Sequence, residues 1–265
     1  MFKNKVVWIT GGSSGIGEAL ALQYASGGAR LVLSARRGDE LERVKALCIG
    51  QGLRDEGVLV LPLDVTDHDS MPGAMSRIID TFGCVDSLIN NAGISQRSLC
   101  VDTDMSVYQQ IFDVDVLGQI ALTKTVLPHM IDRRSGHIAI TSSVAGKIGV
   151  AQRTGYCAAK HAVMGFYDAL RAELDQHGIQ VTTITPGFIN TNISVNALKG
   201  DGSEYGEVDK DIAGGMDVTR CAEVIMDGFR KGIPEIAVGE GIEMKALWLK
   251  RLFPRLVFKK VANMA

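Results

Sequence analysis

The chain has 265 residues, of which 46% are hydrophobic and 22% charged, and its formal net charge is −2. This composition is ordinary for a globular protein, and the near balance of charges argues against dedicated binding of nucleic acid. The five cysteines are scattered without CxxC spacing, and no signal-peptide pattern opens the sequence. We therefore expect no metal site and a reduced, cytoplasmic setting.

Short apolar runs alternate with longer stretches of helical periodicity. The runs that predict strands are residues 6–9, 31–33, 58–61, 88–89, 137–140 and 181–184, and a helix over 217–231 precedes a seventh strand over 235–238. Near-continuous apolar strands separated by helices indicate a parallel sheet with both faces covered. We expect an α/β fold with a single doubly wound domain over residues 1–265, in which helices cover both faces of a seven-stranded, mainly parallel sheet.

Glycines crowd the turn after the first expected strand, which reads Thr10-Gly-Gly-Ser-Ser-Gly-Ile-Gly17. A helix is expected over residues 18–26, and a helix N-terminus presents unpaired N–H groups and partial positive charge to a phosphate. Gly11, Gly15 and Gly17 would leave room for a pyrophosphate. The G-x-x-x-G-x-G spacing differs from the G-x-G-x-x-G dinucleotide fingerprint, and a merely tight turn is the alternative.

The end of the second expected strand reads Ser34-Ala-Arg-Arg37. A site that prefers NAD would place a carboxylate here against the ribose 2′-hydroxyl, but Ala35 occupies that place. Arg36 and Arg37 suit the extra phosphate of NADP, because guanidinium groups pair with phosphate through two hydrogen bonds. The sequence thus favours NADP(H) over NAD(H), unless both arginines are simply the solvated start of the next helix.

Tyr156 and Lys160 lie at i and i+4 on a helix expected over residues 155–174. This spacing places the phenol and the ammonium on one face, where the positive charge makes the phenol a usable acid or base. Ser143 lies at the end of the fifth expected strand, where its hydroxyl could hydrogen-bond a substrate carbonyl. A tyrosine four residues before a lysine is common, whereas the three residues together are specific.

These motifs, in this order, resemble the classical short-chain dehydrogenase/reductase family over nearly the whole chain. The segment 10–17 is similar to the TGxxxGxG cofactor loop of the family, and Asp64-Val65 is similar to the pair near the adenine. Asn90-Asn-Ala-Gly93 matches the NNAG motif, and Pro186-Gly187 with Thr191 matches the PG motif. Ser143 and Tyr156-Cys-Ala-Ala-Lys160 match the catalytic serine and the YxxxK motif. The resemblance implies a Rossmann-type fold and a homo-oligomer, either a dimer or a tetramer.

The resemblance also implies roles for individual residues. Tyr156 would be the general acid in reduction, Ser143 would orient the carbonyl, and Lys160 would bind the ribose and activate Tyr156. The cofactor would be held by Gly11, Ser13, Ser14, Gly15, Ile16, Gly17, Arg36, Arg37, Asp64, Val65, Asn91, Ala92, Gly93, Tyr156, Lys160, Pro186, Gly187, Ile189 and Thr191.

One position departs from the family pattern. The family usually has asparagine in a V-N-x-x-G segment of the long middle helix, whereas this chain reads Val114-Asp-Val-Leu-Gly118. Asp115 is nearly isosteric with asparagine, although a carboxylate adds negative charge and loses two donors. If the role belongs to a main-chain carbonyl in a helix irregularity, Asp115 serves unchanged. We count Asp115 among the catalytic residues and expect a modest rate change for Asp115→Asn.

Two C-terminal segments bear on the substrate and on partners. Residues 188–215 are rich in Asn, Gly, Ser and Asp with scattered apolar positions. They predict a lid over a hydrophobic substrate, with an ordinary surface loop as the alternative. In the tail, 242–265, aromatic and aliphatic residues alternate with lysine and arginine, which suits peripheral contact with a membrane surface. Packing on the body or a subunit contact is the alternative, and Pro254 breaks any continuous helix.

Together these observations predict an NADP(H)-dependent oxidoreductase that moves a hydride between the nicotinamide and a carbonyl or secondary alcohol of a small, hydrophobic molecule. Tyr156 supplies the proton. The tail is similar to that of the member 7-type dehydrogenase/reductases, a subgroup of the family, some of which associate with membranes. The alternative is an NADP(H)-binding sensor or partner-binding protein with little turnover, which only Asp115 favours.

Overall fold

The computed structural model describes residues 2–262. Seven strands form one sheet: β1 (Val6–Thr10), β2 (Arg30–Ser34), β3 (Val58–Val60), β4 (Ser87–Asn90), β5 (Gly136–Thr141), β6 (Ile179–Pro186) and β7 (Glu235–Val238). Their order is β3-β2-β1-β4-β5-β6-β7, and every neighbouring pair is parallel. The predicted doubly wound sheet is confirmed, and its strand order reverses between β1 and β4, where such sheets bind ligands.

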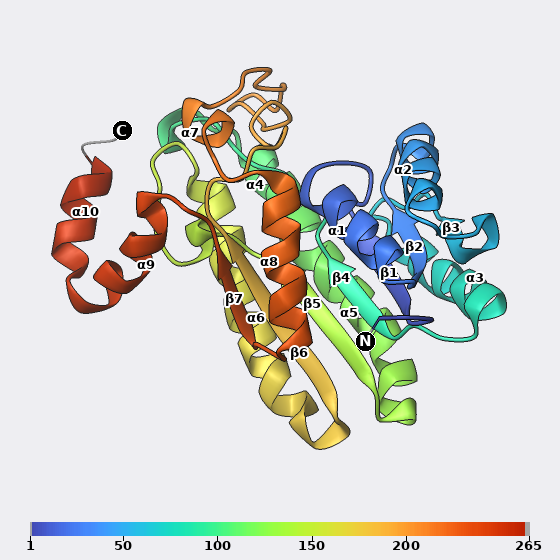
Figure 1. Ribbon diagram of the computed structural model, residues 1–265. Coiled ribbons are helices and arrows are strands. Elements are labelled where there is room, and N and C mark those ends of the chain that lie inside the picture. Colours follow the sequence, from blue (N-terminus) through green and yellow to red (C-terminus); the bar gives the residue numbers. More distant parts are fainter. Residues whose placement is uncertain (1, 263–265) are drawn as a thin grey trace.

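Helices cover both faces of the sheet (Figure 1). One face carries α1 (Gly15–Ser26), α2 (Gly38–Gly50) and α8 (Val218–Arg230), and the other carries α3 (Met71–Phe82), α4 (Met105–Phe112), α5 (Gly118–Arg133) and α6 (Thr154–Leu174). The side chains of β1 alternate between the two faces of the sheet, so that Val6 and Trp8 pack in one core while Val7 and Ile9 pack in the other. The sheet therefore separates two apolar cores.

Two helix boundaries matter for the site. The first helix, α1, begins at Gly15 and not at the expected residue 18, because Gly15 adopts a φ of +57° that starts the turn directly after the extended Ser14. The N-terminus of α1 is thus closer to the end of β1 than predicted. Between α4 and α5 the chain makes a π-helical turn, Asp113–Leu117, which contains the fully buried Asp115. Such irregular turns often occur at functional positions.

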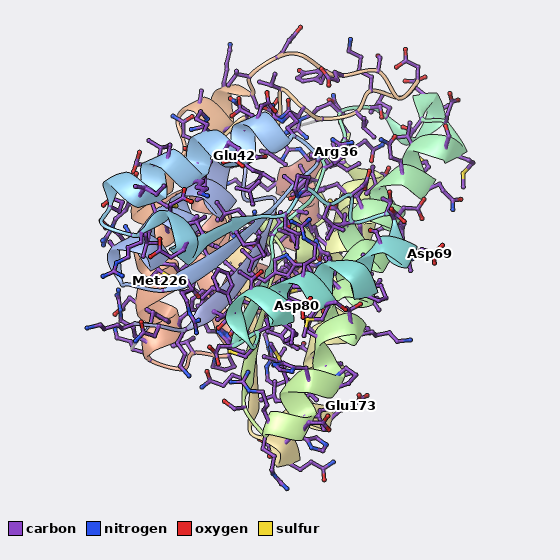
Figure 2. All side chains as sticks on the ribbon, turned by 90° about the vertical axis from the view of Figure 1, so that its right-hand side faces the viewer. Arg36, Glu42, Asp69, Asp80, Glu173 and Met226 are labelled. Atoms are coloured by element: carbon purple, nitrogen blue, oxygen red, sulfur yellow. The ribbon has the colours of Figure 1, made fainter. Side chains whose placement is uncertain are left out.

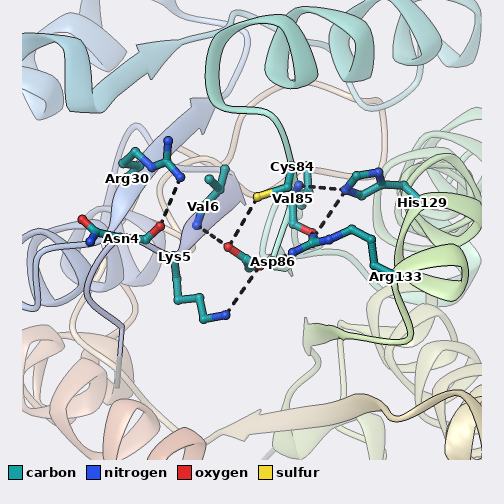
Figure 3. Close-up of polar contacts among 9 residues, drawn as sticks. All are labelled: Asn4, Lys5, Val6, Arg30, Cys84, Val85, Asp86, His129 and Arg133. Carbon is teal, nitrogen blue, oxygen red and sulfur yellow. Dashed lines mark hydrogen bonds and ion pairs between the residues drawn. The ribbon is translucent and has the colours of Figure 1, made fainter.

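The amino ends of the central strands are closed by a network of polar contacts around Asp86 (Figure 3). This carboxylate accepts hydrogen bonds from the Val6 N–H at 2.9 Å and from Arg133 at 2.8 Å, and Lys5 lies 3.7 Å away. The His129 ring accepts the Val85 N–H at 3.3 Å. The network joins β1, β4 and α5 at the end of the sheet opposite the cavity described below.

Candidate active site

A cavity of about 1280 Å³ lies at the carboxyl ends of the strands. Its wall contains Ser143 and all of the predicted cofactor residues except Gly17. The other predicted residue outside the wall is Asp115, which lies behind it against Lys160. The fold therefore brings segments from residue 11 to residue 191 together at one edge of the sheet.

The glycine loop is held against the segment that follows β4. The Asn91 side-chain amide donates to the carbonyls of Thr10 and Gly11 at 3.3 and 3.4 Å, and a Cβ on Gly11, whose φ is +62°, would lie 2.9 Å from the Ala92 Cα. Gly17 was expected to leave space for the pyrophosphate. Its role differs: a Cβ there would lie 2.2 Å from the Gly11 carbonyl oxygen, so this glycine allows the loop to pack on α1.

Arg36 and Arg37 lie between the end of β2 and the N-terminus of α2. Both are exposed, both line the cavity, and within residues 2–262 neither side chain makes an ion pair or a hydrogen bond. In the view of Figure 2, Arg36 lies between Glu42 on α2 and Asp69 before α3. Because two cations at a helix N-terminus oppose the helix dipole, their position suits a bound anion better than it suits the helix.

The pair predicted to lie near the adenine follows β3. Asp64 accepts two hydrogen bonds from Thr66, from its backbone N–H at 2.9 Å and from its hydroxyl at 2.8 Å. These bonds fix the turn that presents Asp64 and Val65 to the cavity.

Ser143, Tyr156 and Lys160 enter the cavity from two elements that are joined to each other. Ser143 lies two residues after the end of β5, and its hydroxyl oxygen accepts the Ala145 N–H at 3.1 Å, which leaves its own proton available to a ligand. Lys160 of α6 donates to the Thr141 carbonyl at 3.1 Å, and its ammonium lies 5.5 Å from the centre of the Tyr156 ring. The arrangement places two hydroxyl groups and one cation at the same wall.

Lys160 and Asp115 form a buried ion pair. The Lys160 Nζ lies 3.0 Å from Asp115 Oδ2, and the side chains are 4% and 0% exposed. Burial lowers the pKa of Lys160, but Asp115 and Tyr156 outweigh that effect and raise it above its usual range. Burial raises the pKa of Asp115, opposed by Lys160 and by the Ile94 N–H. The substitution of aspartate for asparagine therefore adds a charge in direct contact with Lys160.

One ion cluster in the cavity wall was not predicted. Asp209 accepts hydrogen bonds from Arg97 and Arg153, in each case at 2.8 Å. Arg97 precedes α4, Arg153 precedes Tyr156 by one helical turn, and Asp209 lies in the segment 188–215. This ion cluster ties that segment to the wall beside Tyr156. The position of Arg153 before Tyr156 was a usable signal, whereas nothing in the sequence connects Asp209 with either arginine.

The tail forms two helices, α9 (Ile242–Leu252) and α10 (Pro254–Ala262), broken at Pro254 as predicted. They lie beyond β7, on the side of the molecule opposite α2 and α3 (Figure 1). Val257 packs with Val144 and Ile148, and both helices contribute to the cavity wall. Residues 263–265 of the predicted tail lie outside the described residues. Within residues 2–262, no helix is both long enough and apolar enough to cross a bilayer.

Comparisons with known proteins agree with this geometry. The sequence pattern of the short chain dehydrogenase family matches residues 5–201. Human dehydrogenase/reductase SDR family member 7 is 43% identical over 251 residues, which cover 94% of this chain and 74% of that protein. The chain therefore belongs to the short-chain dehydrogenase/reductase family, and its expected resemblance to the member 7-type proteins is confirmed.

Solved structures support the same fold. A short-chain dehydrogenase/reductase from Burkholderia phymatum, in complex with NAD, aligns with a TM-score of 0.84 at 23% identity and covers 96% of this chain and 95% of that one. A metagenomic short-chain oxidoreductase in complex with NADP aligns with a TM-score of 0.66 at 29% identity, covering 70% and 83%. The neighbours thus include proteins that bind either nicotinamide cofactor.

Proposed function

We propose that the chain is an NADP(H)-dependent oxidoreductase that interconverts a carbonyl and a secondary alcohol. The observation that carries this proposal is the meeting of Ser143, Tyr156 and Lys160 in one cavity with the glycine loop at the N-terminus of α1. A protein that only binds the dinucleotide does not need an acid that is paired with a lysine. The sensor hypothesis is therefore the weaker of the two.

The residues present fit a dinucleotide. A Cβ at Gly11 or Gly17 would clash with backbone atoms, so the glycines keep the loop narrow, and Gly15 and Ile16 at the N-terminus of α1 line the cavity. Gly15 and Ile16 would hold the pyrophosphate, Arg36 and Arg37 the additional phosphate of NADP, and Lys160 the ribose. When bound, the nicotinamide supplies or accepts the hydride.

The chain's own residues supply the proton and the orientation of the substrate. The hydroxyl of Ser143 donates a hydrogen bond to the substrate oxygen and aligns it. The phenol of Tyr156 gives its proton to that oxygen in reduction and removes it in oxidation. The ammonium of Lys160 stabilises the phenolate that remains. The NNAG segment and the PG motif shape the wall around these groups.

We infer a hydrophobic substrate from the remainder of the cavity. Beyond the cofactor residues, its wall includes an aliphatic part that comes from three regions of the chain, namely Val144, Ile148, Val150, Ile193, Leu198, Leu249 and Val257, beside charged groups such as Arg97, Arg153 and Asp209. The segment 188–215 crosses this region and would act as a lid, with Asp209 as its anchor. Apolar walls with few convergent polar groups are typical of sites for small hydrophobic ligands.

The test is consumption of NADPH and of NADH with a panel of hydrophobic ketones, aldehydes and quinones. We expect turnover with the wild type and a loss of about 1000-fold or more in Tyr156→Phe, while NADPH binding persists. Tyr24→Phe is the matched control, because Tyr24 is buried on α1 outside the cavity wall and should leave the rate unchanged. Binding of NADPH without turnover on any carbonyl would favour the sensor.

Cofactor preference has its own test. Replacing Arg36 and Arg37 by alanine should lower the affinity for NADPH by about 10-fold or more and leave that for NADH nearly unchanged, because only NADPH carries the 2′-phosphate. Arg54→Ala is the control, since Arg54 is exposed outside the cavity wall. An unchanged ratio of the two dissociation constants would refute the preference for NADP(H).

We further propose that the tail contacts a membrane surface. Its helices expose Ile242, Trp248, Leu249, Leu252, Phe253, Leu256 and Phe258 beside Lys245, Lys250, Arg251, Arg255, Lys259 and Lys260, and Trp248 is 74% exposed. Apolar side chains flanked by cations complement an anionic lipid surface. The protein would then be cytoplasmic and peripheral to a membrane.

Co-sedimentation with vesicles of phosphatidylcholine, with and without phosphatidylserine, tests this proposal. We expect binding that requires the anionic lipid and that is lost when Trp248 and Phe253 are replaced by alanine. Val101→Ala, which removes an exposed side chain far from the tail in sequence, is the control. Failure of the wild type to bind would contradict the membrane contact, and a changed oligomeric state in the tail variant would assign the apolar surface to a subunit contact.

We also propose a homo-oligomer, a dimer or a tetramer, on the strength of the family. Sedimentation velocity at several concentrations tests it, and a species of monomer mass throughout would contradict it.

A further inference from the structure

Asp115 occupies the one place where the chain departs from the pattern of its family, and it touches a residue of the proposed chemistry. We propose that Asp115 is a positioning residue that holds Lys160 by an ion pair and offsets part of its positive charge, so that Tyr156 keeps its proton to a higher pH than it would beside an asparagine. The consequence is a site biased toward reduction near neutral pH. This inference rests on the proposed function.

The contacts of the Asp115 carboxylate direct one of its oxygens toward Lys160. Asp115 Oδ1 accepts the Ile94 N–H at 2.8 Å, which leaves Oδ2 to face the Lys160 ammonium at 3.0 Å. The π-helical turn carries the side chain inward, and a Cβ on Gly93 would lie 3.3 Å from both Asp115 Oδ2 and Lys160 Nζ. The glycine of the NNAG segment thus leaves the pair room to form.

Lys160 is held on two sides. Its ammonium donates a hydrogen bond to the Thr141 carbonyl at 3.1 Å, and Asp115 Oδ2 lies 3.0 Å from Nζ as an ion-pair contact without hydrogen-bond geometry. N–H bonds of the ammonium therefore remain for the cofactor side. The two anchors fix the ammonium at 5.5 Å from the Tyr156 ring before any ligand binds.

The electrostatic argument follows from these positions. A lysine near a phenol favours its ionised form, and a carboxylate in contact with that lysine opposes this effect. The low polarity around both partners, which are nearly fully buried, weakens screening by water. With aspartate at position 115, Tyr156 therefore remains the protonated acid that reduction requires over a wider pH range.

Other charged groups also face the Tyr156 region. Arg153 directly precedes α6, and Arg97, Glu204, Asp209, Lys210 and Asp211 lie at the lid. The helices α9 and α10 bring Glu243, Lys245 and Lys260 to the wall, while Arg36, Arg37 and Asp64 lie at the cofactor end. Asp113 begins the π-helical turn but lies outside this wall. The end of β5 brings only uncharged hydroxyl side chains. None of these groups changes in Asp115→Asn, so a comparison with the wild type isolates the carboxylate.

The decisive variant is Asp115→Asn, which preserves size and the acceptor for the Ile94 N–H. We expect the pH at which ketone reduction falls to half of its maximum to move down by about 0.5–1 unit, with a similar downward shift for alcohol oxidation. With substrates and cofactors saturating, the ratio of kcat for oxidation to kcat for reduction at pH 7 should rise about three- to tenfold. Asp113→Asn is the control in the same turn and should leave both profiles in place. Unshifted profiles in Asp115→Asn, or an upward shift, would overturn the inference.

Two measurements do not depend on turnover. Titration of the Tyr156 ring by ¹³Cζ NMR, assigned with Tyr156→Phe, should show the same downward shift in Asp115→Asn even if no substrate is found, which separates this inference from the proposed function. In the wild type, the ¹³Cγ resonance of Asp115 should be that of a carboxylate at pH 7. A protonated Asp115 there would overturn the ion pair, even if the variant fails to fold.

Discussion

The two ends of the parallel sheet use polar groups in opposite ways. At the amino end, the charges around Asp86 are matched, donor to acceptor, and they lie outside the wall of the cavity at the carboxyl ends (Figure 3). At the carboxyl end lies a cavity of about 1280 Å³, and the side chains of Arg36 and Arg37 line it without a hydrogen-bond or ion-pair partner among residues 2–262. Matched charges stabilise the fold, whereas charges that remain available can bind a ligand.

The difference arises from chain direction. In a parallel sheet with crossover helices, the helix N-termini and the longest loops gather at the carboxyl ends of the strands, where unpaired N–H groups and loop side chains converge. The amino ends receive short returns such as the one before β4, in which Asp86 binds the neighbouring Val6 N–H directly. We therefore expect substitutions at the carboxyl end to change binding and those at the amino end to change stability.

The largest effect on cofactor binding is expected at Gly17. In Gly17→Ala the new Cβ would lie 2.2 Å from the Gly11 oxygen, so the loop and α1 must separate. We expect the affinity for NADPH to fall by about 100-fold or more, measured by fluorescence titration, because the loop loses the shape that admits a phosphate.

Gly12→Ala is the control for this substitution, since its nearest neighbours would be at 3.4 Å or more and its φ is not positive. A small loss in Gly17→Ala, or an equal loss in both variants, would mean that the loop tolerates displacement and that close packing is not its requirement.

Substitutions at the amino end of the sheet should lower the stability of the protein and leave cofactor binding unchanged. Asp86→Asn removes the charge that pairs with Arg133 and Lys5, and we expect the free energy of unfolding in urea to fall by about 2 kcal/mol while the Kd for NADPH changes less than about twofold. Asp227→Asn, which breaks the exposed pair with Lys231, should cost at most about 0.5 kcal/mol. A large loss of cofactor affinity in Asp86→Asn would contradict the separation of the two ends.

Asp86 should also make the stability of the protein depend on pH. Burial raises the pKa of Asp86, but Arg133, the Val6 N–H and Lys5 outweigh it and hold the pKa below its ordinary value of 3.8. A lowered carboxyl pKa contributes stability that is present above pH 3.8 and is lost as the pH falls through the folded-state value. Asp86→Asn should therefore remove part of the acid-induced loss of stability.

The features that could be predicted from the sequence are those that depend on residues close together in the chain. The strands were recognisable because both faces are buried and the runs of Val, Ile and Leu are nearly continuous. Helical spacing placed Tyr156 and Lys160 on one face, and Ser143 made the pair specific. Long-range contacts were not accessible. The Asp209 cluster joins residues 112 and 56 positions apart in the chain, and the pairing of Asp115 with Lys160 depends on a π-helical turn that periodicity does not reveal.

The start of α1 shows a second limit. The apolar pattern of that helix begins after the glycines, so the pattern placed the helix over 18–26, whereas the backbone already turns at Gly15. The role of Gly17 was likewise invisible, because it depends on the distance to Gly11 and not on the cofactor.

A smaller effect is expected at the lid. Asp209→Asn leaves Arg97, whose side chain is only 4% exposed, and Arg153 without their shared carboxylate. We expect the KM for the carbonyl to rise about five- to tenfold with little change in the Kd for NADPH, and the segment 188–215 to be cleaved faster by a protease. Glu207→Gln, at an exposed position of the same segment, is the control. Unchanged proteolysis and KM would remove Asp209 as an anchor.

The smallest effect should appear at His137, at the amino end of β5. Its Nε2 lies 2.9 Å from the Thr182 hydroxyl oxygen, its ring stacks edge-on against Phe229, and burial lowers its pKa to about 4. A lowered histidine pKa means that the unfolded chain binds the proton first, so stability is lost as the pH falls from about 6.5 toward 4.

Because the side chain is partly exposed, we expect a loss of about 1 kcal/mol from His137 over that window, measured by urea unfolding at pH 7 and pH 4.5. His137→Gln should show a correspondingly flatter dependence, and the exposed His68→Gln should not differ from the wild type. Since Asp86 acts only below this window, the amino end should lose stability in two separate steps. If the wild type instead loses stability in a single step, and Asp86→Asn and His137→Gln alter that step alike, the contacts at the amino ends of β4 and β5 titrate as one network.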